Sequence, residues 1–292
     1  MKLLVTGATG FLGWRACTLL ADEGHEVVPL SRPGSRNRAA SAELDPVRMD
    51  AADPAAQDLV EGCDAVLHFA GEPAPAGALR DPARAVLLNA GTTLNLLEGC
   101  AKHGAGLIYP SSVRAAQDPP PDPYAMSKRL GENACRFHPA EATVVRLTSV
   151  FGPGQVTWEG ATGAIAAFAA RAIDEEPIVI PGDPRRTRDF LYVDDMVAGL
   201  ARIVEERRWN QTLTLGTGVG TPLIEVAELV RDTVGSSSPI ETPGGVLAPG
   251  ENESYDTGAG LLLLETRPLD TAVQLYVDWL RRHPAAQGRA RA

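Results

Sequence analysis

The chain has 292 residues, of which 44% are hydrophobic and 22% are charged, a composition that excludes disordered and fibrous proteins. Its formal net charge of −10 argues against nucleic acid and anionic membranes as partners, because both require a basic surface. No apolar signal segment follows Met1 and the four cysteines are widely spaced, so we expect a cytoplasmic protein with reduced thiols and no metal centre.

Short apolar runs alternate with segments of helical period in the first half of the chain. The expected strands are residues 2–7, 25–32, 65–71, 106–112 and 142–149, and the expected helices between them include 12–24 and 87–104. This β-α-β order predicts an α/β fold with a doubly wound parallel sheet and helices on both faces.

Beyond residue 150 the alternation weakens, and turn-forming glycine and proline surround two helical stretches, 164–173 and 223–234. We expect a dinucleotide-binding domain over residues 1–150 and a smaller, mainly substrate-binding domain over 151–292. The two are predicted to be interleaved, because residues 189–218 contain strand-like runs, FLYVDD and TLTLGTG, that we expect to return to the main sheet.

The segment GATGFLG follows the first expected strand and opens the first helix. Gly7 would permit a tight turn, Gly10 would let the backbone approach a pyrophosphate, and Gly13 would allow close packing of helix on strand. The helix N-terminus would attract the phosphates. The pattern predicts a Rossmann-type dinucleotide site at this turn.

The second expected strand ends in Ser31 and Arg32, with Arg36 close behind. An NAD site usually has an acid here that accepts from the ribose 2′-hydroxyl. A neutral serine and two arginines would instead suit a 2′-phosphate, which favours NADP, with NAD still possible. The alternative is that both arginines only line a solvated loop.

The stretch YAMSK places Tyr124 and Lys128 four residues apart, so on a helix they share one face. That spacing alone fits an ordinary solvated surface as well as a catalytic pair. His68, in an apolar run, is read as a core histidine rather than a metal ligand.

The sequence resembles the extended short-chain dehydrogenase/reductase family, the NAD(P)-dependent epimerase/dehydratase group. The matching motifs follow the family order along nearly the whole chain: TGATGFLG, MDAAD, CDAVLHFAG, NAGTTLNLLEGC, YPSS, YAMSK, VVRLTSVFGPGQ, TRDFLYVDDM and TLGTG. The resemblance implies a catalytic set of Ser112, Tyr124 and Lys128. Tyr124 would move a proton at the substrate oxygen, Ser112 would hold that oxygen, and the Lys128 charge would favour the phenolate.

The glycine turn, the end of the second strand and the resemblance together give the candidate binding residues. For the cofactor they are Gly7, Thr9, Gly10, Phe11, Leu12, Gly13, Ser31, Arg32, Arg36, Asp50 near the adenine, Phe69, Ala70, Gly71, Asn89, Tyr124 and Lys128. For the substrate they are Ser111, Ser112, Ser149 and Arg188, of which Arg188 would contact the phosphates of a nucleotide. An internal ion pair between Arg188 and Asp189 or another acid is the alternative for that arginine.

Two departures from the family pattern bear on the reaction. Val113 and Arg114 stand where dehydratases carry Asp-Glu, which disfavours dehydration. Ser149 stands where many relatives have asparagine, which weakens the inference of a nucleotide-sugar substrate.

Three functions are therefore carried forward. The first is an NADP-dependent oxidoreductase that reduces the keto group of a sugar, which we expect to be nucleotide-linked. The second is an NAD(P)-dependent nucleotide-sugar epimerase. The third, from another class, is a non-catalytic dinucleotide-binding sensor, although such proteins usually lose the tyrosine or the lysine. A small-molecule substrate is expected in the enzymatic cases, and a homodimer is possible by analogy with the family.

Overall fold

The computed structural model describes residues 1–35, 44–156, 163–251, 253–255 and 257–282. Arg36 lies outside these residues. No helix in this part of the chain combines the length and the apolar character needed to span a bilayer.

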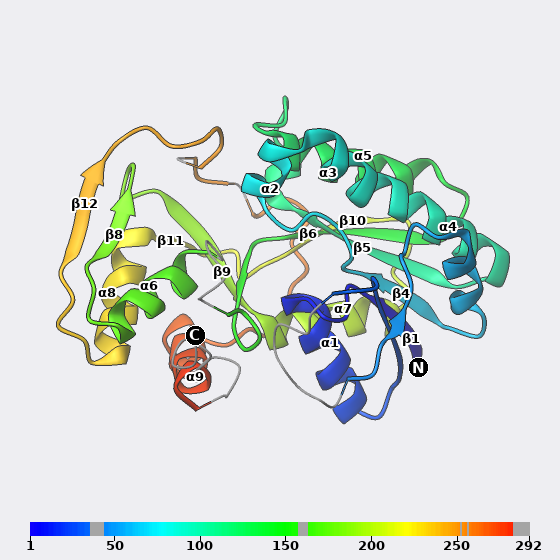
Figure 1. Ribbon diagram of the computed structural model, residues 1–292, viewed down its shortest axis with the longest axis horizontal. Helices are drawn as coiled ribbons and strands as arrows, with labels where there is room; N and C mark the ends of the chain where they lie inside the picture. The colour runs from blue at the N-terminus through cyan, green and yellow to red at the C-terminus, as the bar shows by residue number, and fades with distance from the viewer. Residues whose placement is uncertain (36–43, 157–162, 252, 256, 283–292) are drawn as a thin grey trace.

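A seven-stranded parallel sheet forms the larger part of the molecule (Figure 1). Its strand order is β10-β6-β5-β4-β1-β2-β3. The strands are β1 (Lys2–Thr6), β2 (Glu26–Ser31), β3 (Val47–Arg48), β4 (Ala65–His68), β5 (Gly106–Ser112), β6 (Ala142–Leu147) and β10 (Thr212–Leu215). This confirms the predicted doubly wound parallel sheet.

Helices cover both faces of the sheet (Figure 1). One face carries α1 (Phe11–Asp22) and α7 (Val193–Glu205), and the other carries α4 (Thr92–His103) and α5 (Pro123–Phe137). Side chains alternate along each strand, so Leu3 and Val5 pack toward α1 and α7 while Leu4 packs toward α4. Shorter elements link them: η1 (Pro54–Val60), α2 (Pro75–Arg80), α3 (Pro82–Val86), the π-helical η2 (Leu87–Gly91) and η3 (Val113–Ala116).

A smaller region lies beside the carboxyl ends of β5, β6 and β10 (Figure 1). It contains a three-stranded sheet of order β11-β9-β7 and a two-stranded sheet of β12 and β8. The elements are β7 (Ser149–Phe151), α6 (Ala164–Ile173), β8 (Ile178–Pro181), β9 (Thr187–Tyr192), β11 (Gly220–Pro222), α8 (Leu223–Val234), β12 (Ile240–Gly244) and α9 (Leu269–Arg282). Its core includes edge-on contacts of Phe151 with three aromatic rings.

The predicted interleaving is only partly correct. β10 and α7 do return to the larger part, but β9, which contains Phe190 and Tyr192, pairs with β7 and β11 in the small sheet. Phe190 and Tyr192 bury their rings against Phe151, so the aromatic core of the smaller region takes up this strand.

Candidate functional site

The glycine turn lies between β1 and α1, at the carboxyl edge of the sheet. Gly7 has φ +66°, and a Cβ there would come within 2.8 Å of the backbone of residues 69 and 70. A Cβ on Gly13 would lie 2.3 Å from the Gly7 carbonyl oxygen, so close packing of helix on turn requires glycine. Gly10 is the N-cap of α1 and no side chain caps the helix, which leaves the first-turn N–H groups around Phe11 and Leu12 for an anion.

The segment that follows β4 lies beside the glycine turn and forms one wall of the candidate site. The Ala70 N–H donates to Thr6 Oγ1 at 3.1 Å, which holds Phe69 and Ala70 against the glycine turn. Asn89 is fully buried and accepts from the Glu72 N–H at 2.9 Å, and a Cβ on Gly71 would come 2.3 Å from its Oδ1. Asn89 therefore shapes the wall from behind, and the turn fits a dinucleotide.

The end of β2 forms the far rim of the same site. Ser31 is buried, and its Oγ accepts from the Thr9 N–H and donates to Thr9 Oγ1, both at 3.1 Å. Ser31 thus ties β2 to the glycine turn, while Arg32 is exposed beside it. Asp50 lies just after β3, and its Oδ1 accepts from the Ala52 N–H at 2.9 Å.

The three predicted catalytic residues converge at the carboxyl end of β5. Ser112 is its last residue and caps η3 by accepting from the Arg114 N–H at 3.3 Å. Tyr124 and Lys128 lie on α5, which packs along β5. The Lys128 Nζ donates to the Pro110 carbonyl oxygen at 2.9 Å, and Tyr124 is hydrogen-bonded to the Ser112 hydroxyl.

Burial shapes the protonation of this set. Burial raises the pKa of Tyr124 to about 12, and the positive charge of Arg114 and the hydrogen bond with Ser112 oppose the increase. Burial lowers the pKa of Lys128 to about 8, although Glu132 and Glu72 favour its charged form. The ammonium lies 5.1 Å from the Tyr109 ring centroid.

Two residues of the predicted set have interior partners. Ser111 Oγ donates to Glu132 Oε1 at 2.6 Å, inside a network in which Arg146 also binds Glu132. Ser111 is buried there, so we remove it from the substrate-binding set. His68 bonds Thr6 through Nδ1 and Thr92 through Nε2, and burial lowers its pKa to about 3, which confirms a core histidine.

In the smaller region, Arg188 lies on β9 and Ser149 lies on the neighbouring strand β7. Arg188 donates to the carbonyl oxygens of Thr187 at 2.8 Å and Glu251 at 2.7 Å, and also to that of Glu253. The alternative pairing with Asp189 is not observed, because its carboxylate accepts from Thr217 and Gly218 instead. Burial and the nearby Arg186 and Arg114 charges lower the pKa of Arg188.

Sequence reasoning missed the contacts of Arg114, which it treated only as a departure from the dehydratase pattern. Its guanidinium is buried and pairs with Asp122 and, at 3.0 Å, with Glu251. Tyr255 lies between two arginines, with its ring centroid 5.5 Å from the Arg114 Cζ and 5.3 Å from the Arg188 Cζ. Residues 249–251 and Tyr255 thus contact both Arg114, next to the catalytic set, and Arg188 in the smaller region.

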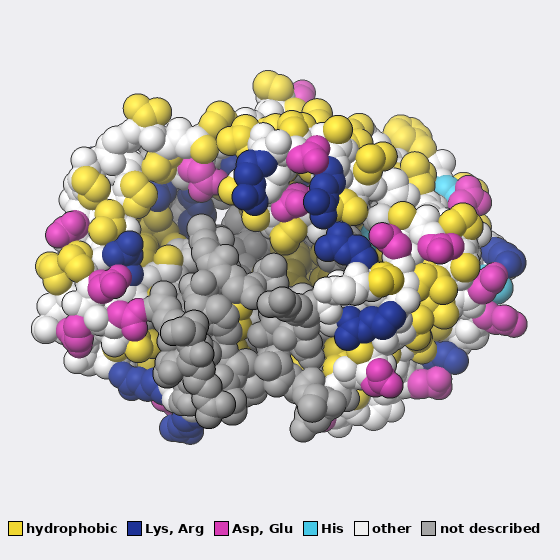
Figure 2. All heavy atoms as spheres, in the orientation of Figure 1, with side chains coloured by type: hydrophobic (Ala, Val, Ile, Leu, Met, Phe, Trp, Pro, Cys, Tyr) yellow, Lys and Arg dark blue, Asp and Glu magenta, His cyan; other side chains and the backbone are white. Residues whose placement is uncertain are grey.

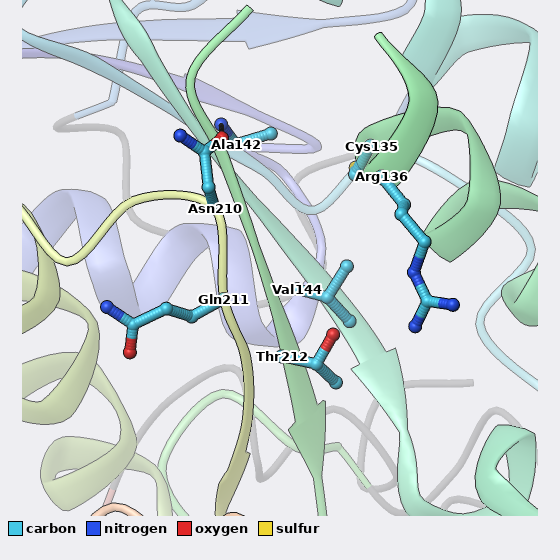
Figure 3. A pocket seen from close by; sticks show the side chains of 7 residues that line it. All are labelled: Cys135, Arg136, Ala142, Val144, Asn210, Gln211 and Thr212. Atoms are coloured by element: carbon cyan, nitrogen blue, oxygen red, sulfur yellow. Dashed lines mark hydrogen bonds between the residues drawn. The ribbon is translucent and has the colours of Figure 1, made fainter.

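A cavity of about 220 Å³ opens elsewhere, between the end of α5 and the beginnings of β6 and β10 (Figure 3). Cys135, Val144 and Thr212 line it. Since β6 and β10 begin here, the cavity lies at the amino edge of the sheet, opposite the glycine turn. It is therefore separate from the candidate site.

The chain matches the model of the NAD dependent epimerase/dehydratase family over residues 3–216. Among curated proteins, it is 24% identical over 268 residues to UDP-glucuronic acid decarboxylase 1 of Arabidopsis thaliana, covering 82% of this chain and 60% of that protein. It is 25% identical over 255 residues to a putative UDP-glucose 4-epimerase of Methanocaldococcus jannaschii, covering 80% of this chain and 82% of that one. The chain thus spans about 60% of the length of the curated decarboxylases that it matches.

Solved structures share the fold along almost the whole chain. Pal from Bacillus thuringiensis superposes with a TM-score of 0.83 at 23% identity, covering 96% of this chain and 99% of that one. A UDP-glucose 4-epimerase from Thermotoga maritima superposes with a TM-score of 0.79 at 24% identity, covering 97% and 99%.

Proposed function

Because the chain belongs to the NAD dependent epimerase/dehydratase family, we propose that it is an NAD(P)-dependent epimerase that oxidises and re-reduces one carbinol carbon of a nucleotide sugar. The observation that carries this proposal is the convergence of Ser112, Tyr124 and Lys128 at the sheet edge where the glycine turn opens. Relatives named as UDP-glucose 4-epimerases support the choice among the reactions of the family.

A bound nicotinamide would supply hydride acceptance and return at the substrate carbon. Ser112 would hold the substrate oxygen, and Tyr124 would take its proton during oxidation and give it back during reduction. The Lys128 ammonium would bind the cofactor ribose and keep the local electrostatic potential positive. The side chains at 113 and 114 supply no acid for elimination of water, since Val113 is apolar and Arg114 is a cation held by carboxylates.

A ketoreductase is the second candidate, and the end of β2 favours it. Ser31 and Arg32 provide no carboxylate against a 2′-phosphate, and a reductase that exchanges its cofactor each turnover commonly takes NADPH. Several solved structures with a similar fold contain NAD, so the choice of cofactor needs its own measurement.

Stoichiometry separates the two reactions. We expect the purified chain, loaded with NAD or NADP, to interconvert UDP-glucose and its C4 epimer with no net change in the absorbance of reduced nicotinamide. A reductase would instead consume one reduced cofactor for each molecule of keto sugar nucleotide converted. Product formed only with net cofactor oxidation would contradict the epimerase proposal and establish the reductase.

The cofactor prediction concerns Arg32. If its guanidinium binds a 2′-phosphate, NADPH should bind more tightly than NADH, and Arg32→Ala should reduce that preference by roughly tenfold, the value of one charge-assisted hydrogen bond. Fluorescence titration of both cofactors measures the preference, and Arg80→Ala, at the end of α2, serves as the control. Tighter binding of NADH by the unchanged chain would contradict the prediction.

We propose that Arg188 binds a substrate phosphate and that Ser149 lies beside it. Arg188 contacts only carbonyl oxygens among its described hydrogen bonds, so these bonds leave its charge without a partner anion. Such a guanidinium, close to Arg186 and Arg114 in a chain of net charge −10, would favour a diphosphate.

A homodimer through the helices on the α4 and α5 face is also proposed. Hydrophobic side chains gather along the top of the view in Figure 2, where Figure 1 places α2, α3 and α5. Leu87, Leu94, Leu130 and Phe137 are exposed large hydrophobic residues of η2, α4 and α5. Sedimentation equilibrium would test this.

We retain the cytoplasm as the expected location, because all four cysteines are free thiols.

A further inference from the structure

Arg114 uses its guanidinium entirely on protein partners. Its Nε donates to Asp122 Oδ2 at 3.1 Å, and Nη2 donates to the same carboxylate and to the Pro249 carbonyl oxygen. Nη1 donates to Glu251 Oε1 at 3.0 Å and, at 3.4 Å, to the Gly250 carbonyl oxygen. An arginine has five N–H donors, so in this arrangement none remains for a ligand. Arg114 can affect the reaction only through its neighbours or its charge.

Asp122 connects the guanidinium to the helix that carries Tyr124. Its Oδ2 binds Arg114, while its Oδ1 accepts from the Ala125 N–H at 2.9 Å as the N-cap of α5. Both side chains are buried, with 11% of Arg114 and 6% of Asp122 exposed, so the pair is shielded from water. The ion pair therefore fixes the first turn of α5, which includes Tyr124.

The backbone of Arg114 makes the second connection, because its N–H donates to Ser112 Oγ at 3.3 Å. Ser112, Arg114, Asp122 and the first turn of α5 thus form one continuous set of hydrogen bonds. This set joins the residue that would hold the substrate oxygen to the residue that would transfer its proton.

The charged groups around Tyr124 support the same role for Arg114. The groups that act on the Tyr124 phenol are Arg114 and Ser112, which favour the phenolate, and Asp122 and Glu72, which oppose it. Among these, Arg114 is the cation. The Lys128 ammonium, which the sequence assigns to this task, donates to the Pro110 carbonyl oxygen and lies over the Tyr109 ring.

The geometry points to Arg114 as a positioning residue for proton transfer by Tyr124. Its ion pair with Asp122 and the hydrogen bond from its own N–H to Ser112 hold Ser112 and Tyr124 in fixed relative positions. Its charge stabilises the Tyr124 phenolate. This role rests on the proposed function, since it presumes that Tyr124 transfers a proton to and from a substrate oxygen.

The test compares Arg114→Lys with the double variant Arg114→Met/Asp122→Asn, which removes the cation without leaving a buried, unpaired carboxylate and keeps a residue able to cap α5. The control is Arg129→Met, because Arg129 also ties α5 to η3 and the residues after it, through Ala115, Gln117 and Asp118, and none of these hydrogen bonds involves Ser112 or Asp122. Each variant is assayed with UDP-glucose over a range of pH.

We expect the double variant to lose at least about tenfold in kcat with little change in KM. The rise of kcat/KM with pH should move to higher pH, because the Arg114 charge acts on the Tyr124 phenol more strongly than the opposing Asp122 charge that is removed with it. Arg114→Lys should recover part of both effects, and Arg129→Met should show the wild-type pH dependence. A double variant whose pH profile and kcat match those of Arg129→Met would overturn the role of Arg114.

A readout that needs no turnover separates this inference from the proposed function. Tyrosine labelled with ¹³C at the carbon bearing the hydroxyl gives one signal for each of the five tyrosines, and Tyr124→Phe identifies that of Tyr124. The Tyr124 signal should shift in the double variant and not in Arg129→Met. If the wild type turns over no nucleotide sugar, the proposed function fails, and an unmoved Tyr124 signal still refutes the positioning role by itself.

Discussion

Tyr124→Phe is expected to lower turnover of the proposed nucleotide-sugar reaction by about 10²–10⁴-fold, the range in which general acid–base assistance contributes. The phenylalanine keeps the ring and its packing on α5 but removes the group that moves the proton. Cofactor affinity should stay within about twofold, because the glycine turn and Lys128 are unchanged. Steady-state kinetics and a cofactor titration on the same preparation measure both quantities.

Tyr276→Phe is the matched control, since it also removes a tyrosine hydroxyl from a buried hydrogen bond. Its hydroxyl donates to the Gln155 carbonyl oxygen at 2.6 Å, within the smaller region and apart from α5. This variant should lower stability by about 1 kcal/mol and leave turnover nearly unchanged. A loss below tenfold for Tyr124→Phe would remove Tyr124 from the mechanism, and a protein that only senses dinucleotide would show no turnover in either form.

The parts of the site that sequence predicts well are those in which a local pattern and a local structure coincide. Gly7 and Gly13 follow a strand and open a helix, and their tight backbone contacts are contacts within one turn or with the adjacent strand end. The Tyr124–Lys128 spacing needs only a helix to place both on one face. These inferences require almost no knowledge of tertiary packing.

Ser111 could have been placed correctly by a simpler argument. Successive side chains of a strand point to opposite faces, so Ser111 and Ser112 cannot both face the same site while β5 remains regular. Ser112 ends the strand and caps η3, whereas Ser111 points into the layer between sheet and helix, where Glu132 and Arg146 lie. The motif YPSS was read as a unit although its residues alternate.

Two other features depended on packing that no local pattern records. The second half of β9, residues 190–192, is as apolar as a main-sheet strand, and only the partners of β9, β7 and β11, place it in the smaller region. The Arg114–Asp122 pair joins residues on two different elements, η3 and α5, and Glu251 comes from 137 positions away. An ion pair between two elements depends on how those elements pack. The sequence therefore showed the charge of Arg114 but not which acidic residues bind it.

Lys128→Met is expected to stabilise the folded chain at neutral pH, even though it should abolish the proposed activity. Burial lowers the pKa of Lys128 from its ordinary value of 10.5 to about 8, which corresponds to roughly 3 kcal/mol of destabilisation at pH values below 8. Methionine also loses the bond to the Pro110 carbonyl oxygen, at a cost of roughly 1 kcal/mol. The net gain in the free energy of unfolding should therefore be about 2 kcal/mol.

The sign of the pH dependence makes this prediction specific to the buried charge. Between about pH 8 and about pH 10.5 the folded chain releases the Lys128 proton while the unfolded chain still holds it, so the wild type gains stability as pH rises. The advantage of Lys128→Met should shrink over that range, as urea unfolding at about pH 7 and about pH 10 would show. Lys102→Met removes only an exposed pair with Asp58, so it should leave the free energy of unfolding nearly unchanged at either pH. An equal or less stable Lys128→Met at neutral pH would mean that the lysine is held without a desolvation cost.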